Sequence, residues 1–317
     1  MKAAVLDRLG TAPSYADFAE PELKTGETLV HVSAAALKQI ERAIVAGTHY
    51  SSPKQLPIIP GIDGVGRRED GTRVYFMVKR RPFGAMAQRA PADWTVPVPD
   101  GIDDAFAAAV VNPALSAWLP LVYRAGLSRG ETVMILGATG TSGRMAVAAA
   151  RILGAGRVIA AGRRMDILEG LGADAVIDLS LPTAELKQRF FEETSQGISV
   201  VVDYVWGAAA EVAIAALIRP DLAVTDGEIR YVSVGAMAGP TIAMPSAALR
   251  GARLQLLGSG TGNFPPTAQM AEYVSDVLRH ACAGSFPMDI VTRPLSDVQA
   301  AWEDAPGADT RIVLVNG

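Results

Sequence analysis

The chain has 317 residues, half of them hydrophobic, and 29 Lys and Arg against 33 Asp and Glu leave a formal net charge of −4. This apolar content excludes a mainly disordered protein, and the slightly acidic balance lacks the basic surface that nucleic-acid phosphates require. A chain of this length buries about 75% of the surface that its unfolded form exposes, and it usually folds as two domains.

The cysteine content and the N-terminal segment indicate a cellular compartment. The single cysteine, Cys282, cannot form an internal disulfide, which suits a reducing cytoplasm. Asp7 and Arg8 interrupt the first segment before the apolar run of a signal peptide could develop. The apolar run Ala105–Val111 ends at Asn112, well short of the ~20 residues that span a bilayer. We therefore expect a soluble cytoplasmic protein with no nucleic-acid or membrane partner.

The predicted elements divide the chain into zones. Residues 1–114 contain short apolar runs that Pro and Gly interrupt, which is typical of a β-rich domain. Residues 115–250 alternate short apolar strands with helical stretches, the pattern of βαβ units. Strands are expected there at 133–137, 157–162, 175–179, 200–205 and 229–235, with helices at 144–153 and 165–171. Because each strand is almost entirely apolar, it needs cover on both faces, so an α/β fold with a doubly wound parallel sheet is expected.

The last zone, residues 251–317, is too small to form a core of its own. It contains a strand-like segment at 253–259, a long helix at 266–283, a short helix at 298–303 and a closing strand at 311–315. We expect it to return to the first zone. The middle zone, 115–250, would then be inserted between the two pieces of one domain, 1–114 and 251–317.

A glycine-rich turn is the most informative segment. Residues 133–143 read VMILGATGTSG, so a strand leads directly into three glycines and a helix of small residues follows. This spacing permits a tight turn and a close approach of backbone to a pyrophosphate, and the helix start offers unpaired N–H groups to the phosphates. The expected contacts are Gly137, Thr139, Gly140, Thr141, Ser142 and Gly143. The sequence therefore predicts a dinucleotide site, and the alternative is a glycine-rich packing turn without a ligand.

The end of the next predicted strand indicates which dinucleotide binds. An NAD site has Asp or Glu there for the ribose hydroxyls, whereas Arg accommodates the 2′-phosphate of NADP. This chain has Gly162, Arg163 and Arg164, and the first carboxylate is Asp166. Guanidinium groups hold phosphate through paired hydrogen bonds, so we expect NADPH rather than NADH. The alternative is a solvated helix start, although two positive charges there oppose the helix dipole.

Six segments along the chain form a recognisable set. They read LPIIPGIDGVG (56–66), DGTRVYF (70–76), PVPDGIDDAFAAAVVNPALSAW (97–118), GETVMILGATGTSG (130–143), LGADAVIDL (171–179) and VVVDYVWG (200–207). With these segments the chain resembles, over essentially its whole length, the medium-chain dehydrogenase/reductase superfamily in its zinc-independent quinone oxidoreductase-like branch. The resemblance implies a GroES-like β-rich catalytic domain, a Rossmann domain, an active-site cleft between them and a homodimer.

The chain departs from the zinc-dependent members of this superfamily. They carry a Cys near the segment Lys38–Glu41 and a Gly-His-Glu where this chain has Gly61-Ile62-Asp63, and they carry a four-Cys lobe that is absent here. We therefore expect no metal. Without a Lewis acid, an isolated ketone that receives hydride becomes a poorly supported alkoxide. A quinone or an α,β-unsaturated carbonyl spreads the charge, so a few hydrogen bonds suffice, and we expect reduction of such a conjugated acceptor by NADPH.

Three residues of the first zone are candidates for catalysis. Tyr50 resembles the proton donor of related enoyl-thioester reductases, and the alternatives are a ring that stacks at the cleft rim and a proton supplied by water. Asn112 lies in a segment that resembles the interdomain segment of the same reductases, where its amide could orient nicotinamide or substrate; a hinge or cap role is equally open. Lys38 replaces an Asn that is common in quinone reductases, and the alternative is a surface pair with Glu41.

Further cofactor contacts are implied by the resemblance. Ser116 falls where relatives carry a Thr near the nicotinamide. The loops that contain residues 235–237 and 258–259 match the two loops that flank the nicotinamide in the family, and ordinary turns are the alternative for these loops. The expected contacts are Ser116, Gly235, Ala236, Met237, Gly258 and Ser259. Residues 203–206 are expected to close the adenine side.

The sequence supports three functions. The first is an NADPH-dependent quinone or enone reductase. The second is an enoyl-thioester reductase, which Tyr50 and Asn112 favour and for which Lys79–Arg81 is the best basic cluster. The third is a non-catalytic sensor or structural protein that binds NADPH without turnover. The segment 253–259 is a candidate edge strand for pairing across a homodimer axis.

Overall fold

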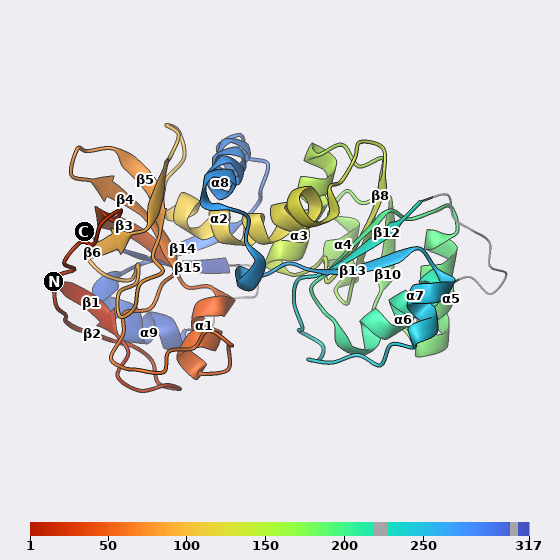
Figure 1. The fold of residues 1–317 in the computed structure, drawn as a ribbon, viewed down its shortest axis with the longest axis horizontal. Coiled ribbons are helices and arrows are strands. Elements are labelled where there is room, and N and C mark those ends of the chain that lie inside the picture. Colours follow the sequence, from red (N-terminus) through yellow and green to blue (C-terminus); the bar gives the residue numbers. More distant parts are fainter. Residues whose placement is uncertain (219–226, 305–309, 317) are drawn as a thin grey trace. The chain divides into compact units, whose positions relative to one another are not determined.

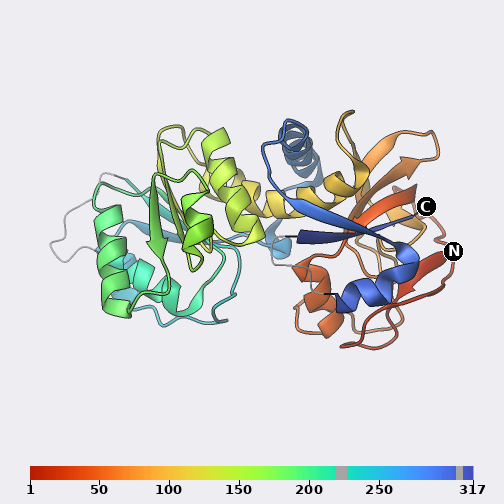
Figure 2. The same cartoon turned by 180° about the vertical axis from the view of Figure 1, so that it is seen from behind.

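The computed structural model describes residues 1–218, 227–304 and 310–316. Its helices and strands fall into two units: unit 1 comprises Met1–Asn112 with Thr267–Gly317, and unit 2 comprises Pro113–Pro266. The two ends of the chain lie close together in unit 1 (Figures 1 and 2). Unit 1 is rich in strands and unit 2 contains a parallel sheet with helices, so the expected α/β fold class is confirmed.

Unit 2 is built on a six-stranded parallel sheet (Figure 1). Its order across the sheet is β10 (Ala175–Asp178), β9 (Arg157–Gly162), β8 (Thr132–Leu136), β11 (Val200–Asp203), β12 (Ile229–Ser233) and β13 (Leu254–Gly258). Counted within the unit this is 3-2-1-4-5-6, the order of dinucleotide-binding folds. Such a sheet binds its ligand where the strand order reverses, which here is between β8 and β11.

Helices cover both faces of this sheet, which explains why its inner strands are almost entirely apolar. They are α3 (Thr141–Ile152), α4 (Met165–Glu169), α5 (Thr183–Thr194), α6 (Gly207–Leu217) and α7 (Ser246–Gly251). Right-handed crossovers place α3 and α4 on one face and α5 and α6, which pack on each other, on the opposite face.

The second boundary of unit 2 differs from the expected one. Residues 251–266, expected with the terminal zone, lie in unit 2 because β13 pairs in parallel with β12, with Leu254 opposite Ile229. The partner of a parallel strand is distant in sequence, so the local pattern of residues 253–259 did not reveal it. The first boundary falls directly after Asn112.

Unit 1 contains a seven-stranded sheet and a separate pair of strands. The sheet order is β14 (Asp289–Pro294), β15 (Thr310–Val315), β3 (Thr28–Ala36), β4 (Asp63–Arg68), β5 (Arg73–Met77) and β7 (Trp94–Pro97), with β6 (Arg89–Ala92) on β3. The separate pair is β1 (Lys2–Val5) and β2 (Ser14–Asp17). The helices of the unit are α1 (Gln39–Ala46), most of α2 (Asp104–Leu119), α8 (Thr267–Cys282) and α9 (Val298–Glu303).

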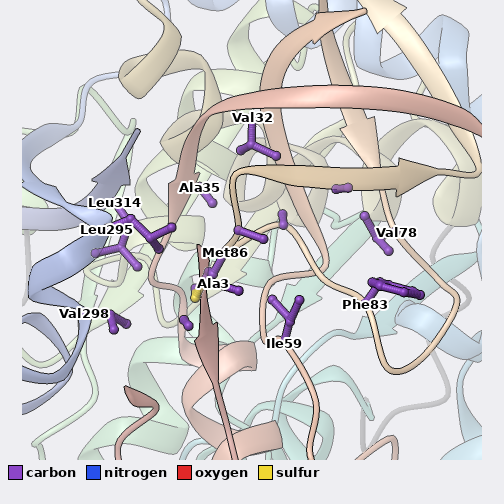
Figure 3. Close-up of a cluster of buried hydrophobic side chains, with 14 of the residues drawn as sticks. Ala3, Val32, Ala35, Ile59, Val78, Phe83, Met86, Leu295, Val298 and Leu314 are labelled. Carbon is purple, nitrogen blue, oxygen red and sulfur yellow. The ribbon is translucent and has the colours of Figure 1, made fainter. Parts of the chain in front are cut away.

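The core of unit 1 joins the first and last parts of the chain (Figure 3). Val32, Ile59 and Met86 from the N-terminal part pack in one buried cluster with Leu295 and Leu314 from the C-terminal part. The terminal segment therefore completes a core that the first 112 residues begin.

The helix α2 is longer than the apolar run from which it was predicted. It passes through Asn112 and Pro113 and continues into a π-helical segment, Pro120–Ala125. The combined helix, Asp104–Ala125, is long and apolar enough to cross a membrane, but 78% of its most apolar window is buried inside the protein. A core helix has the same properties, so this is weak support for a membrane span.

Candidate functional site

The glycine turn of unit 2 leaves the sheet at the end of β8 and leads into α3. Gly137 has a φ of +85°, a conformation that side chains disfavour. A Cβ on Gly143 would lie 2.2 Å from the carbonyl oxygen of Gly137, so the helix can begin this close to the strand only with glycine there. The turn thus has the close packing that the sequence pattern predicts.

The first turn of α3 offers unpaired N–H groups. The residue before the helix is Gly140, which has no side chain to cap it, and the first turn of α3 contains no acidic residue. Thr141 and Ser142 begin the helix and are partly exposed, whereas Thr139 is buried. The free N–H groups and the positive end of the helix dipole fit a diphosphate.

The basic end of β9 is tied to the glycine turn. The guanidinium of Arg164 donates a hydrogen bond to the carbonyl oxygen of Thr139 at 2.5 Å. A Cβ on Gly162 would lie 2.7 Å from the Thr139 methyl carbon, so the threonine packs directly on that glycine. Arg163 is exposed. The guanidinium of Arg164 therefore lies beside the turn, and residues 162–164 include no carboxylate.

The remaining cofactor candidates of unit 2 follow strands at the same edge of the sheet. Gly235, Ala236 and Met237 come after β12, while Gly258 ends β13 and Ser259 follows it. The N–H of Ser259 donates to the carbonyl oxygen of Ser233, which connects these two loops. Because all strands of this sheet are parallel, their carboxyl ends meet at one edge. The structure thus brings these candidates to the edge that carries the glycine turn.

Ser116 joins this edge through its main chain. The hydroxyl of Tyr204, in the loop after β11, donates a hydrogen bond of 2.9 Å to the carbonyl oxygen of Ser116. Residues 203–206 were expected to close the adenine side. Asp203, the last residue of β11, is instead fully buried and its carboxylate accepts hydrogen bonds within the protein, so Asp203 does not itself form a ligand contact.

In unit 1, Lys38 belongs to a buried ionic cluster. Its ammonium lies 2.5 Å from Asp63 Oδ1 and 3.1 Å from Glu41 Oε1, and all three side chains are at most 2% exposed. Glu41 also accepts the N–H groups of Lys38 and Ile62, at 3.2 and 3.4 Å. The alternative of a surface pair between Lys38 and Glu41 is therefore wrong.

The electrostatics of this cluster follow from its burial. Burial alone would lower the pKa of Lys38, but the charges of Asp63 and Glu41 outweigh it and raise that pKa. Burial raises the pKa of Glu41 and the charge of Asp63 adds to this, while the Lys38 ammonium offsets the two only in part. Burial, and then the charge of Asp63, raises the pKa of Tyr75 well above its ordinary value. The catalytic role of Lys38 stays a prediction, and its buried contacts favour a structural role.

The other two catalytic candidates also lie in unit 1. Tyr50 is 75% exposed, and its ring lies 4.1 Å from that of His49, centroid to centroid. Asn112 is partly buried within α2, which continues for seven more residues, so a helix-cap role is wrong. The roles of Tyr50 and Asn112 in catalysis stay predictions.

Comparisons with known proteins agree with this architecture. No protein-family model matches the chain. The chain is 28% identical to the probable NADPH-dependent quinone reductase tdiC of Emericella nidulans, over 96% of each chain. It is also 28% identical to the quinone oxidoreductase of Thermus thermophilus, solved alone and with NADPH, with a TM-score of 0.75 over 99% of this chain and all of that one. These similarities support the resemblance of the chain to the quinone oxidoreductase-like branch of the medium-chain dehydrogenase/reductase superfamily.

Another relative is named for a different acceptor. The 2-methylene-furan-3-one reductase of Solanum lycopersicum is 25% identical over 59% of this chain and 52% of its own length.

Proposed function

We propose that this protein is an NADPH-dependent oxidoreductase that transfers hydride to a conjugated acceptor, a quinone or an α,β-unsaturated carbonyl. The glycine turn carries the proposal, because its strand-to-helix packing tolerates no side chain at Gly143 and lies beside the point where the strand order reverses. The names of the relatives from Emericella nidulans, Thermus thermophilus and Solanum lycopersicum support both the coenzyme and the acceptor class.

Each part of the coenzyme has candidate residues in unit 2. The N–H groups of the first turn of α3, residues 141–143, would hold the diphosphate, and Arg163 with Arg164 the 2′-phosphate. The loops after β12 and β13, together with Ser116, would hold the nicotinamide. The bound coenzyme supplies the hydride. We assign Asn112 to orienting nicotinamide or substrate, and the Tyr50 hydroxyl to donating a proton to the reduced acceptor.

A steady-state panel of acceptors tests the function. NADPH oxidation is measured with a quinone, an enal and an enoyl thioester, after an NADPH titration has established binding. We expect turnover with the quinone and the enal. Turnover with the enoyl thioester alone would favour an enoyl-thioester reductase. Binding of NADPH without turnover on any acceptor would favour a sensor or structural protein.

The Arg163→Ala variant is expected to bind NADPH about 10-fold or more weakly and NADH unchanged, because one charge-assisted phosphate contact is lost. Arg164→Ala should do the same, although it also removes the hydrogen bond to Thr139. Fluorescence titration with both nucleotides measures the effect. The matched control is Arg189→Ala, an exposed arginine on α5. An equal change for NADPH and NADH would contradict a 2′-phosphate site.

The Tyr50→Phe variant is expected to lower kcat for the enal by about 100-fold, the usual contribution of a general acid, with NADPH affinity unchanged. The loss for the quinone should be smaller, because a hydroquinone anion can take its proton from water. Because Tyr50 is exposed, the variant should keep the fold of the wild-type protein. The control is Tyr15→Phe, which changes another exposed tyrosine of the same unit. An unchanged kcat for the enal would assign the proton to water.

We further propose that the protein works without zinc, as a cytoplasmic homodimer. The segment Lys38–Glu41 and Ile62 stand where the superfamily's zinc-dependent members carry ligands, and the Lys38 ammonium already bridges the carboxylates of Glu41 and Asp63. No group of three or more His, Cys, Asp or Glu in the described ranges could hold a metal ion. The strand β13 ends the parallel sheet, and its exposed Leu256 supports an interface there.

A further inference from the structure

The carboxylate of Asp203 is turned back onto the loop that follows it. Asp203 is the last residue of β11 and is fully buried. Its Oδ1 accepts the N–H groups of Val205 and Trp206, at 2.7 and 3.0 Å. One side-chain oxygen therefore fixes the first half of the turn between β11 and α6.

The other oxygen of Asp203 is held from the neighbouring strand. The hydroxyl of Tyr231, on β12, donates to Asp203 Oδ2 at 2.7 Å, and Tyr231 is also fully buried. Burial, and then the adjacent carboxylate, raises the pKa of Tyr231 well above its ordinary value. The tyrosine therefore stays protonated as a donor, so both oxygens of Asp203 have partners.

The turn that Asp203 fixes has an unusual backbone. Trp206 has φ 54° and ψ −157°, a conformation that residues other than glycine rarely adopt. Such a backbone persists only where its surroundings hold it. The hydrogen bond to the Trp206 N–H, and the Trp206 ring at 6.4 Å from the Tyr231 ring, supply these restraints.

This turn lies between two loops of the proposed coenzyme site. A Cβ on Gly137 would lie 3.0 Å from a methyl carbon of Val205, so the turn packs directly on the glycine turn. A Cβ on Gly235 would lie 2.7 Å from the carbonyl oxygen of Tyr204. Residues 204–206 therefore fill the space beside the switch point between β8 and β11, and their position limits where the flanking loops can lie.

We infer that Asp203 and Tyr231 are positioning residues for coenzyme binding: together they hold the turn 204–206 against Gly137 and Gly235. Neither side chain reaches a ligand, because both are fully buried. They act through the backbone of Val205 and Trp206. This inference rests on the proposed binding of NADPH.

The mildest test is Tyr231→Phe, which removes one hydroxyl and keeps the ring. We expect the Kd for NADPH to rise about 10-fold, the effect of one lost hydrogen bond to a charged group. The control is Thr194→Val, which removes a buried hydroxyl that bonds within α5. The end of α5 leads into the start of β11, at the opposite edge of the sheet. The two variants should lower the thermal midpoint similarly, but only Tyr231→Phe should weaken NADPH.

A second test uses the strained backbone. Asp203→Ala removes the acceptor for Val205 and Trp206 and should weaken NADPH more than Tyr231→Phe does. Glycine adopts the Trp206 conformation readily, so adding Trp206→Gly to Asp203→Ala should recover affinity relative to Asp203→Ala alone. A double-mutant cycle that includes the Trp206→Gly single variant measures the coupling between Asp203 and Trp206.

The outcomes separate this inference from the proposed function. If the wild-type protein does not bind NADPH, the proposed function fails. If it binds and Tyr231→Phe binds as tightly, or if the effects of Asp203→Ala and Trp206→Gly simply add, the positioning role of Asp203 and Tyr231 is wrong.

Discussion

Replacing Lys38 by methionine is expected to lower the free energy of unfolding by about 3–5 kcal/mol, the usual cost of breaking a buried ion pair from one side. Methionine keeps most of the side-chain volume but leaves Glu41 and Asp63, both at most 1% exposed, without their shared cation. Chemical denaturation of both proteins at neutral pH measures the difference. The raised pKa of Lys38 means that its stabilisation is complete at neutral pH, and it is lost only as the pH rises past the ordinary lysine value of 10.5.

Two further variants make this prediction specific. Lys2→Met removes a lysine from the exposed pair with Asp17 and should cost less than about 1 kcal/mol. The triple variant Lys38→Met, Glu41→Gln, Asp63→Asn neutralises the whole cluster and should be more stable than Lys38→Met alone, because no buried charge remains unpaired. A cost for Lys38→Met no larger than that for Lys2→Met would show that the cluster is not a buried ionic contact in solution.

Replacing Gly143 by alanine is expected to weaken NADPH binding by about 100-fold or more and to lower stability by about 1–3 kcal/mol through overpacking. The added Cβ would lie 2.2 Å from the Gly137 carbonyl oxygen and 2.7 Å from the Ala138 Cα. Both neighbours are backbone, so α3 must move away from the turn and take its N–H groups with it. Nucleotide titration and thermal unfolding measure the two effects.

The control for this variant is Gly170→Ala in the same unit. Gly170 has a φ of −82°, and a Cβ there would come no closer than 3.5 Å to another group. It should leave both the NADPH affinity and the thermal midpoint nearly unchanged. Unimpaired NADPH binding by Gly143→Ala would exclude the turn 137–143 as the diphosphate site.

The parts of the fold that the sequence predicted are those with a local signal. The strands of unit 2 are continuous apolar runs and the glycines of the turn have a fixed spacing, so β8, β9 and α3 could be predicted without knowledge of their partners. The helix α8 was predicted at 266–283 from the length of its pattern and is observed at Thr267–Cys282.

The features that escaped prediction depend on contacts between distant residues. Lys38 and Asp63 are 25 residues apart and meet only because β3 pairs with β4, so a lysine that would ordinarily be exposed becomes buried. Asp203 and Tyr231 are 28 residues apart, and their bond depends on the parallel register of β11 and β12. The available signal was an Asp at the end of one apolar strand and a Tyr within the next strand along the chain. This signal does not specify the register in which the two strands pair, so it did not predict the hydrogen bond.

The order of the two units along the chain has a consequence for synthesis. Unit 2 is continuous, so all six of its strands emerge from the ribosome before α8 does. The N-terminal part of unit 1 cannot complete its sheet at that stage, because the Ala34–Ala36 end of β3 pairs with β15, which is synthesised much later. Co-translational folding should therefore complete the inserted unit first, while that exposed strand end is open to non-native pairing until β15 emerges.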